Sequence, residues 1–205
     1  MIAECIVIGY LLGSIPVAWI LTKLVTDQDI RKMGSGNVGV MNVMLSVSRW
    51  AGLLVFLAEA IKGILAVVIG QAFGGGDIVL SAGVLATVIG TRWPVWLCFR
   101  GGRGNTAAYG ALLALSWPTL FVGFIIWNLL RRLTGSSFWA TRVSFLLGPL
   151  ILGVFTQSWM FGLLCVPLSL VYLLTQDRRT DDHLIIKERW SSFWTFLRSP
   201  RRHRE

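Results

Sequence analysis

Two glycine-rich loops, MGSGNVG at 33–39 and FRGGRGN at 99–105, interrupt a chain that is otherwise mostly apolar. Repeated glycine lets a backbone turn its N–H groups toward an anion at close range. Arginine adds charge and can bind a phosphate through two parallel hydrogen bonds. The cations in or beside these loops are Arg31, Lys32, Arg100 and Arg103. Together the two loops indicate a site for phosphate groups at a lipid surface.

The first loop concentrates glycine, serine and asparagine between two apolar segments. Backbone N–H groups, a hydroxyl and side-chain amides gathered in one pocket would suit a phosphate or a polyol. The candidate ligands here are Gly34, Ser35, Gly36, Asn37 and Asn42. The alternative is an ordinary connecting loop, and the residues alone leave both open.

The second loop carries the more specific signal, because glycine and arginine alternate just before an expected helix rich in small residues. Such a loop resembles an anion nest that ends at a helix N-terminus, where N–H groups point toward negative charge. The candidate ligands are Arg100, Gly101, Gly102, Arg103, Gly104 and Asn105.

A third candidate is the charged pair Glu59 and Lys62 inside an apolar run. Residues three apart share one face of a helix. Charges within a membrane span are costly and usually face a partner or a cavity. The pair therefore either lines a functional pocket or neutralises itself structurally, and both readings stay open.

The composition predicts the elements that must position these groups. Of 205 residues, 55% are hydrophobic and 14% are charged, against roughly 25% charged in a soluble domain. The apolar residues form long runs, which are typical of an all-α polytopic membrane protein. About seven spans are expected, at roughly 3–25, 50–72, 78–96, 105–116, 118–131, 141–155 and 159–175. Gly13, Ser14 and Pro16 predict a packing kink in the first.

Charge placement predicts the topology. Of the 19 Lys and Arg residues, all except Lys62 lie near one set of connections or in the tail, and the alternate connections around 73–77, 116–118 and 156–158 carry none. The positive-inside rule then places the N-terminus outside, the C-terminus inside and both glycine loops in the cytoplasm. The net charge of +9 therefore does not indicate nucleic-acid binding.

Several site classes are not expected. Cys5, Cys98 and Cys165 are far apart, and both histidines, His183 and His203, lie near the C-terminus. We therefore expect no metal site and no Ser-His-Asp triad.

The chain is expected to comprise a membrane-embedded domain, 1–176, and a basic cytoplasmic tail, 177–205. The tail's aromatic and basic residues fit either an amphipathic helix on the inner leaflet or a disordered end.

Five segments in this order resemble the bacterial membrane-integral glycerol-3-phosphate acyltransferases that use acyl phosphate as donor. The segments are YLLGSIP (10–16), GSGNVG with Asn42 (34–42), EAIKG (59–63), G-x-x-x-P (90–94) and F-R-G-G-R-G (99–104). They cover roughly residues 5–115. The resemblance implies seven helices, an outside N-terminus, a location in the bacterial cell membrane and an active site facing the cytoplasm.

This chain departs from the family pattern at several functional positions. In our alignment the family usually has arginine at Leu45, aspartate at Glu59, histidine at Thr91 and lysine at Arg103. The family's C-terminal His-Arg-x-Asn run would fall on residues 178–181, where this chain reads Arg-Arg-Thr-Asp. The chain is thus identified as a divergent member.

The resemblance implies transfer of a fatty acyl group from acyl phosphate to the 1-hydroxyl of glycerol 3-phosphate, giving lysophosphatidic acid for phospholipid synthesis. It implies catalytic roles for Ser35, Lys62 and Arg103, and substrate binding by the other loop residues and Glu59. No metal or cofactor is implied. The alternative is a catalytically silent paralogue that binds lipid phosphates or partners another lipid enzyme.

Overall fold

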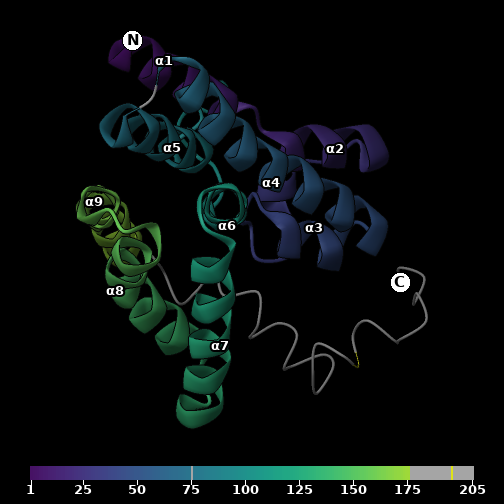
Figure 1. Cartoon of the computed structure of the whole chain (residues 1–205). Coiled ribbons are helices and arrows are strands. Elements are labelled where there is room, and N and C mark those ends of the chain that lie inside the picture. The colour runs from purple at the N-terminus through teal and green to yellow at the C-terminus, as the bar shows by residue number, and fades with distance from the viewer. Residues whose placement is uncertain (75, 176–194, 196–205) are drawn as a thin grey trace.

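The computed structural model describes residues 1–74, 76–175 and 195. Within these residues the regular secondary structure is helical (Figure 1). The α-helices are α1 (Ile2–Ser14), α2 (Val17–Thr26), α3 (Val40–Ser46), α4 (Arg49–Ala72), α5 (Asp77–Arg92), α6 (Asn105–Leu115), α7 (Trp117–Thr134), α8 (Ser137–Thr156) and α9 (Trp159–Thr175), and the short 3-10 turns are η1 (Ile30–Lys32) and η2 (Val95–Leu97). The predicted tail, 177–205, lies outside the described residues apart from residue 195.

Helices occupy all seven regions where the sequence predicts spans. By length and composition, the described residues contain four segments that can cross a membrane: Ile2–Thr26, Arg49–Ala72, Asp77–Leu97 and Phe138–Thr156. The prediction of an all-helical protein with several apolar spans is therefore confirmed. The total of seven crossings and the direction of the termini remain predictions.

The first expected span is two helices rather than one. Ile15 is extended, with φ −60° and ψ 112°, between the end of α1 and Pro16. A residue before proline is pushed away from helical geometry, and proline has no N–H to continue the ladder. The break leaves carbonyl groups at the end of α1 that need other donors.

Glycine brings α1 and α5 into backbone contact. A Cβ placed on Gly13 would overlap the Thr87 carbonyl, and one placed on Gly90 would overlap the Tyr10 carbonyl. Small residues at such positions let membrane helices approach closely. The contact fixes the end of α5, from which the second glycine loop departs.

Helices α4 and α6 pack in the same way. A Cβ on Gly63 would overlap the Ala107 carbonyl, and one on Gly110 would overlap the Ala60 carbonyl. The first turn of α6 therefore packs against the middle of α4. The contact is at Gly63, the residue that follows Lys62.

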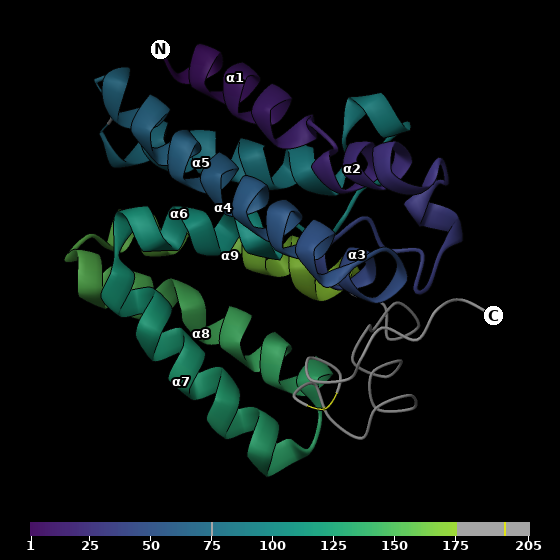
Figure 2. The same cartoon turned by 90° about the vertical axis from the view of Figure 1, so that its right-hand side faces the viewer.

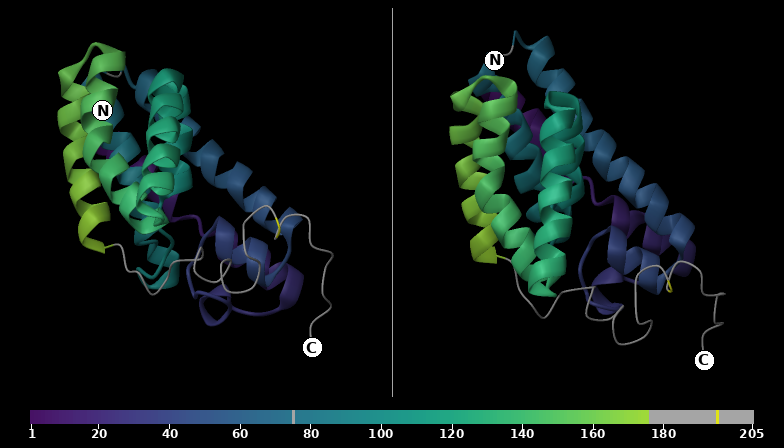
Figure 3. Two further views of the ribbon diagram at one scale, coloured as in Figure 1. Left: turned by 90° about the horizontal axis from the view of Figure 1, so that it is seen from below. Right: turned by 60° about the horizontal axis from the view of Figure 1, so that its bottom comes forward.

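The glycine loops gather at one end of the bundle. Figure 2 shows α2 and α3 beside one end of α4, and Figure 3 shows the N-terminus at the opposite end of the molecule from α2, α3 and the last described turn of α9. Buried apolar side chains underlie the first loop at that end: Ala18, Ile30, Val38, Val43, Ala51, Val55 and Leu97. Helices α7 and α8 form a hairpin, and α9 packs on α8 and α5.

Candidate functional site

The two glycine loops touch each other. A Cβ on Gly102 would overlap the Val38 carbonyl, so the second loop lies directly on the first. Arg92 Nη1 donates a hydrogen bond to Gly102 O at 3.1 Å. The sequence predicted only that the loops share one side of the membrane, whereas the structure brings them into a single assembly.

Asn42 organises the first loop from inside. Its side chain is 0% exposed. Its Nδ2 donates to the carbonyls of Met33 and Asn37, each at 2.9 Å, and its Oδ1 accepts from Ser35 N at 3.2 Å and Ser46 Oγ at 3.0 Å. These bonds use the amide's donors and acceptors within the protein. Asn42 thus shapes the loop in this structure, and direct contact with a ligand stays a prediction.

The loop's own N–H groups are also engaged. Gly36 N donates to Met33 O at 2.9 Å, and Asn37 N donates to Ser35 Oγ at 3.4 Å. Gly34 and Gly36 have φ of 52° and 72°, the left-handed region in which glycine is favoured. The loop therefore offers a ligand the half-buried side chains of Ser35 and Asn37 rather than a backbone nest.

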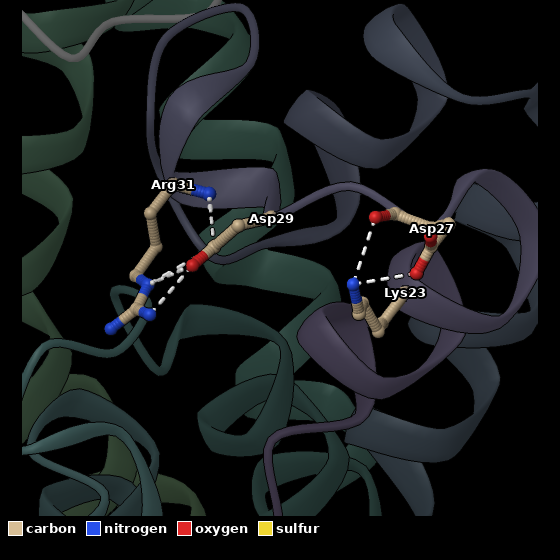
Figure 4. Close-up of polar contacts among 4 residues, drawn as sticks. All are labelled: Lys23, Asp27, Asp29 and Arg31. Atoms are coloured by element: carbon tan, nitrogen blue, oxygen red, sulfur yellow. Dashed lines mark hydrogen bonds and ion pairs between the residues drawn. The ribbon is translucent and has the colours of Figure 1, made fainter.

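Arg31 is held by an acid next to it (Figure 4). Its Nε and Nη2 bond to the Asp29 carboxylate at 2.6–3.0 Å, and Asp29 Oδ1 also caps η1 by accepting from Arg31 N at 2.9 Å. The Arg31 guanidinium lowers the pKa of Asp29 to about 2. Lys23 and Asp27 form a similar local pair, with Nζ to Oδ1 at 2.6 Å. The Asp29–Arg31 pair therefore stabilises the segment that leads into the first glycine loop.

Lys62 donates hydrogen bonds to the carbonyl groups at the break between α1 and α2. Its Nζ donates to Ile15 O at 2.6 Å and to Gly13 O at 3.4 Å, and it pairs with Glu59 Oε1 at 2.8 Å. The three bonds match the three donors of an ammonium group. The cation also suits a helix C-terminus, where carbonyl groups concentrate negative charge.

One carboxylate oxygen of Glu59 takes no part in the ion pair with Lys62. The residue is 8% exposed, and its Oε2 is buried without a hydrogen-bond partner among the described residues. A buried carboxylate oxygen is costly unless a donor reaches it. The structure thus shows the mutual neutralisation of the pair, and a functional role for Glu59 or Lys62 stays a prediction.

Glu59 lines an inner pocket in which all five sequence motifs meet. The volume is about 210 Å³, including its open mouth. Its lining residues are Gly13, Ile15, Pro16, Val17, Ala18, Val38, Glu59, Thr91, Pro94, Gly101 and Gly102. Thr91 Oγ1 donates to the same Gly13 carbonyl as Lys62, at 3.3 Å.

The second loop folds back on the end of α5. Arg100 N donates to Leu97 O at 3.2 Å, Gly101 N to Arg92 O at 3.2 Å and Gly102 N to Thr91 O at 3.1 Å. The expected nest is therefore not formed by Gly101 and Gly102. The first turn of α6, which begins after Gly104 at φ 77°, is the part of the motif where helical geometry leaves N–H groups without intrahelical acceptors.

Arg103 and Asn105 face a second, outer pocket of about 340 Å³, including its mouth. Its lining residues are Val88, Ile89, Arg92, Trp93, Arg103, Gly104, Asn105, Ala108, Phe145 and Tyr172. Asn105 Nδ2 donates to Tyr172 OH at 3.2 Å, and Phe145 stacks on Tyr172 with ring centroids 4.0 Å apart. Arg100 is exposed and lines neither pocket.

Of the predicted site residues, Glu59, Gly101 and Gly102 line the inner pocket, and Arg103, Gly104 and Asn105 line the outer one. The others line neither pocket: Gly34, Ser35, Gly36, Asn37, Asn42, Lys62 and Arg100. The sequence did not place Arg92, Phe145 or Tyr172 in the site. Arg92 carries a signal, because it lies inside the G-x-x-x-P motif. Phe145 and Tyr172 lie in apolar runs that mark only membrane helices.

Comparisons with known proteins agree with these motifs. The sequence model of a family described as glycerol-3-phosphate acyltransferase matches residues 3–181. Glycerol-3-phosphate acyltransferase 2 of Moorella thermoacetica is 37% identical over 158 residues, 77% of this chain and 81% of that protein. The glycerol-3-phosphate acyltransferase of Rhodopseudomonas palustris is 35% identical over 172 residues, 84% of this chain and 87% of that one.

A solved structure has the same fold. The crystal structure of PlsY, an integral membrane glycerol 3-phosphate acyltransferase, in its glycerol 3-phosphate form superposes with a TM-score of 0.75 and 26% identity, covering 90% of each chain.

Proposed function

Because the chain belongs to the glycerol-3-phosphate acyltransferase family, we propose that it transfers a fatty acyl group from acyl phosphate to the 1-hydroxyl of glycerol 3-phosphate. The product is lysophosphatidic acid, a precursor in phospholipid synthesis. The observation that carries the proposal is the meeting of the two glycine loops, the Glu59–Lys62 pair and the end of α5 around adjacent pockets.

The reaction needs little covalent help from the protein. The acceptor oxygen attacks the acyl carbonyl carbon, a new ester C–O bond forms, and the C–O bond to phosphate breaks. The departing phosphate takes the hydroxyl proton, so atoms and charges balance. An acyl phosphate is an activated mixed anhydride, and the protein's contribution is to orient the two substrates and to stabilise negative charge.

The two pockets suit different parts of the substrates. The outer pocket presents Arg103, so a phosphate belongs there. The inner pocket presents Glu59 Oε2, which has no hydrogen-bond partner among the residues that the structure describes. This oxygen repels a phosphate and accepts a hydrogen bond from a hydroxyl group. Lys62 holds the α1–α2 break and Glu59 in place, and acts through that carboxylate.

The first loop completes the arrangement. The contact of the Val38 carbonyl with Gly102 places the first loop against the second, and in this proposal the side chains of Ser35 and Asn37 in the first loop position the acceptor. Asn42 supports both by fixing the loop backbone. In this assignment the site faces the cytoplasm of a bacterial cell, on a multi-pass protein with its N-terminus outside.

Purified protein incubated with palmitoyl phosphate and glycerol 3-phosphate tests the proposal. Inorganic phosphate and lysophosphatidic acid should appear in equal amounts, and neither should form when glycerol 3-phosphate is omitted, beyond spontaneous hydrolysis of the donor. Binding of acyl phosphate without product would favour a catalytically silent lipid-phosphate binder instead.

A further inference from the structure

The inner pocket contains a buried hydrogen-bond acceptor that no described residue satisfies. The side chain of Glu59 is 10% exposed. Its Oε1 accepts from Lys62 Nζ at 2.8 Å, whereas its buried Oε2 has no hydrogen-bond partner among the described residues. Burial of a carboxylate oxygen without a donor is costly. A ligand that brings a hydrogen-bond donor to this oxygen would therefore be bound preferentially.

The side chains around this pocket do not supply the missing donor. Of the described side chains that line it, only those of Glu59 and Thr91 carry polar atoms. The Thr91 hydroxyl directs its one hydrogen toward the carbonyls of Gly13 and Thr87, at 3.3 and 3.1 Å. The adjacent Lys62 ammonium already makes three hydrogen bonds. A donor for Oε2 must therefore come from the ligand.

The second glycine loop does not supply this donor either. Gly101 N donates to Arg92 O at 3.2 Å, and Gly102 N donates to Thr91 O at 3.1 Å. A group that has only acceptor atoms, such as a ketone, would meet the Glu59 carboxylate and would gain no hydrogen bond from these N–H groups. The pocket therefore favours a hydroxyl group.

Lys62 keeps the Glu59 carboxyl group in its acceptor form. The ion pair joins the two side chains inside α4. An adjacent cation favours the ionised form of a carboxyl group, and an ionised carboxylate has no hydrogen to donate. Oε2 can therefore distinguish a hydroxyl group from a carbonyl group at the same carbon of a ligand.

The mechanism decides which hydroxyl group of glycerol 3-phosphate can meet Glu59. In the proposed reaction the 1-hydroxyl attacks the acyl carbonyl and gives its proton to the departing phosphate, so that proton is not available to the carboxylate. The 2-hydroxyl keeps its hydrogen throughout the reaction and can donate it to Oε2. The second carbon of the acceptor is therefore the one that the inner pocket recognises.

We propose that Glu59 binds the 2-hydroxyl of glycerol 3-phosphate and makes the acceptor site selective for a hydroxyl group at that carbon. The proposal rests on the proposed function for the identity of the acceptor. Lys62 is a positioning residue in this assignment, because it acts through the Glu59 carboxylate.

Three acceptors that differ only at the second carbon test the proposal in the wild type. Glycerol 3-phosphate carries a hydroxyl group there, 3-hydroxypropyl phosphate carries hydrogen, and dihydroxyacetone phosphate carries a carbonyl oxygen. With palmitoyl phosphate as donor, kcat/KM for glycerol 3-phosphate should exceed that for either analogue by roughly ten- to a hundredfold, the range for a hydrogen bond to a charged group. Equal kcat/KM values for glycerol 3-phosphate and either analogue would overturn the proposal.

Glu59→Gln assigns this preference to the side chain. A carboxamide can donate as well as accept, so the preference for glycerol 3-phosphate should fall by roughly tenfold, and dihydroxyacetone phosphate should gain most. Each ratio is measured on one preparation, so a reduced fraction of folded protein leaves it unchanged. If Glu59 instead removed the proton of the 1-hydroxyl, all three acceptors would slow by the same factor. An unchanged ratio in Glu59→Gln therefore overturns the proposal.

Further variants control for charge and for folding. Asp27→Asn makes the same change from acid to amide at an exposed residue after α2, and it should leave the acceptor ratios unchanged. Glu59→Asp keeps a carboxylate that only accepts, and it should retain more of the preference than Glu59→Gln does. If Glu59→Gln alone does not fold, the double variant with Lys62→Met removes both charges and is measured in its place, with the same expected ratio.

A binding measurement replaces the kinetics if the wild type transfers no acyl group. Titration calorimetry compares glycerol 3-phosphate with 3-hydroxypropyl phosphate on the wild type and on Glu59→Gln. Tighter binding of glycerol 3-phosphate by the wild type, with loss of that difference in the variant, supports the assignment, and only the proposed function then fails. Equal binding of the two compounds by the wild type, or binding of neither, overturns the assignment.

Discussion

In the first loop, some polar residues shape the loop and others can face a ligand. Asn42 and Ser35 give the same signal in the sequence, a small polar residue among glycines. Only the fold shows that the Asn42 amide is enclosed by the loop and that the Ser35 side chain is half-buried at its edge. The sequence could thus predict that this loop is polar and special, and could not assign roles within it.

The Asp29–Arg31 pair predicts a pH dependence of stability. The pKa of Asp29 falls from 3.8 to about 2 in the folded protein, so its carboxylate stabilises the fold above about pH 4, and this contribution is lost as pH falls toward 2. Asp29→Asn should lower the free energy of unfolding at neutral pH by about 1–2 kcal/mol, after discounting for partial exposure.

Chemical unfolding of the wild type and Asp29→Asn between pH 2 and 7 measures this effect. The difference between the two proteins should shrink steadily below pH 4. A difference that stays constant across the range would show that the pair does not act through ionisation of Asp29.

The Glu59–Lys62 pair predicts strong coupling between two substitutions. Glu59→Gln leaves a buried ammonium without its counter-charge, and Lys62→Met leaves a buried carboxylate, each at a cost of about 3–5 kcal/mol. The double variant removes both charges and should cost less than the sum of the two, although the Ile15 carbonyl still loses its donor. A double-mutant cycle of unfolding free energies measures the coupling. Strict additivity would contradict it.

At the scale of elements, apolar runs predicted where helices lie, and proline with glycine predicted the disturbance near residues 13–16. The apolar runs could not predict which helices pair. The break is completed by Lys62 from a distant part of the chain, and such a long-range hydrogen bond leaves no local signal. The same holds for α4 and α6, whose close contact depends on matching glycines in both helices.

Gly63 tests whether this close contact positions the site. Gly63→Ala would place a Cβ against the Ala107 carbonyl, and relief requires α6 to move away from α4. We expect a loss of about 1–3 kcal/mol in stability, as for overpacked cores, and a fall in acyl transfer because Asn105 begins α6 and Arg103 lies just before it.

A matched variant controls for the loss of a helical glycine. Gly123→Ala lies in α7, where a Cβ would meet nothing within 4 Å. It should be neutral or slightly stabilising, since alanine is the better helix former. Thermal unfolding and the phosphate-release assay compare the two. Equal effects of the two substitutions would rule out helix approach as the cause.

At the scale of the whole molecule, the bundle places its basic and its uncharged connections at opposite ends. The end of α4 and the start of α5, at Ala72 and Asp77, lie far from α3, whereas both glycine loops and the Lys23–Arg31 region lie at the α3 end. Hydropathy and charge could predict this two-ended arrangement. They could not predict that residues of the 91–104 segment line two pockets, because other walls of those pockets come from α1, α8 and α9.

Cysteines placed at the two ends of the bundle should be labelled from opposite sides of the membrane. Cysteine introduced at exposed Gly76 should react with a membrane-impermeant maleimide from outside, and cysteine at exposed Lys32 should react only after permeabilisation. Native Cys98 is exposed beside the second loop and must be replaced by serine in both variants. When restored alone, it provides an independent reporter for the same side as Lys32. The charge distribution predicts a cytoplasmic location for that side, so labelling of Lys32→Cys in intact cells would contradict both the predicted topology and the proposed cytoplasmic site.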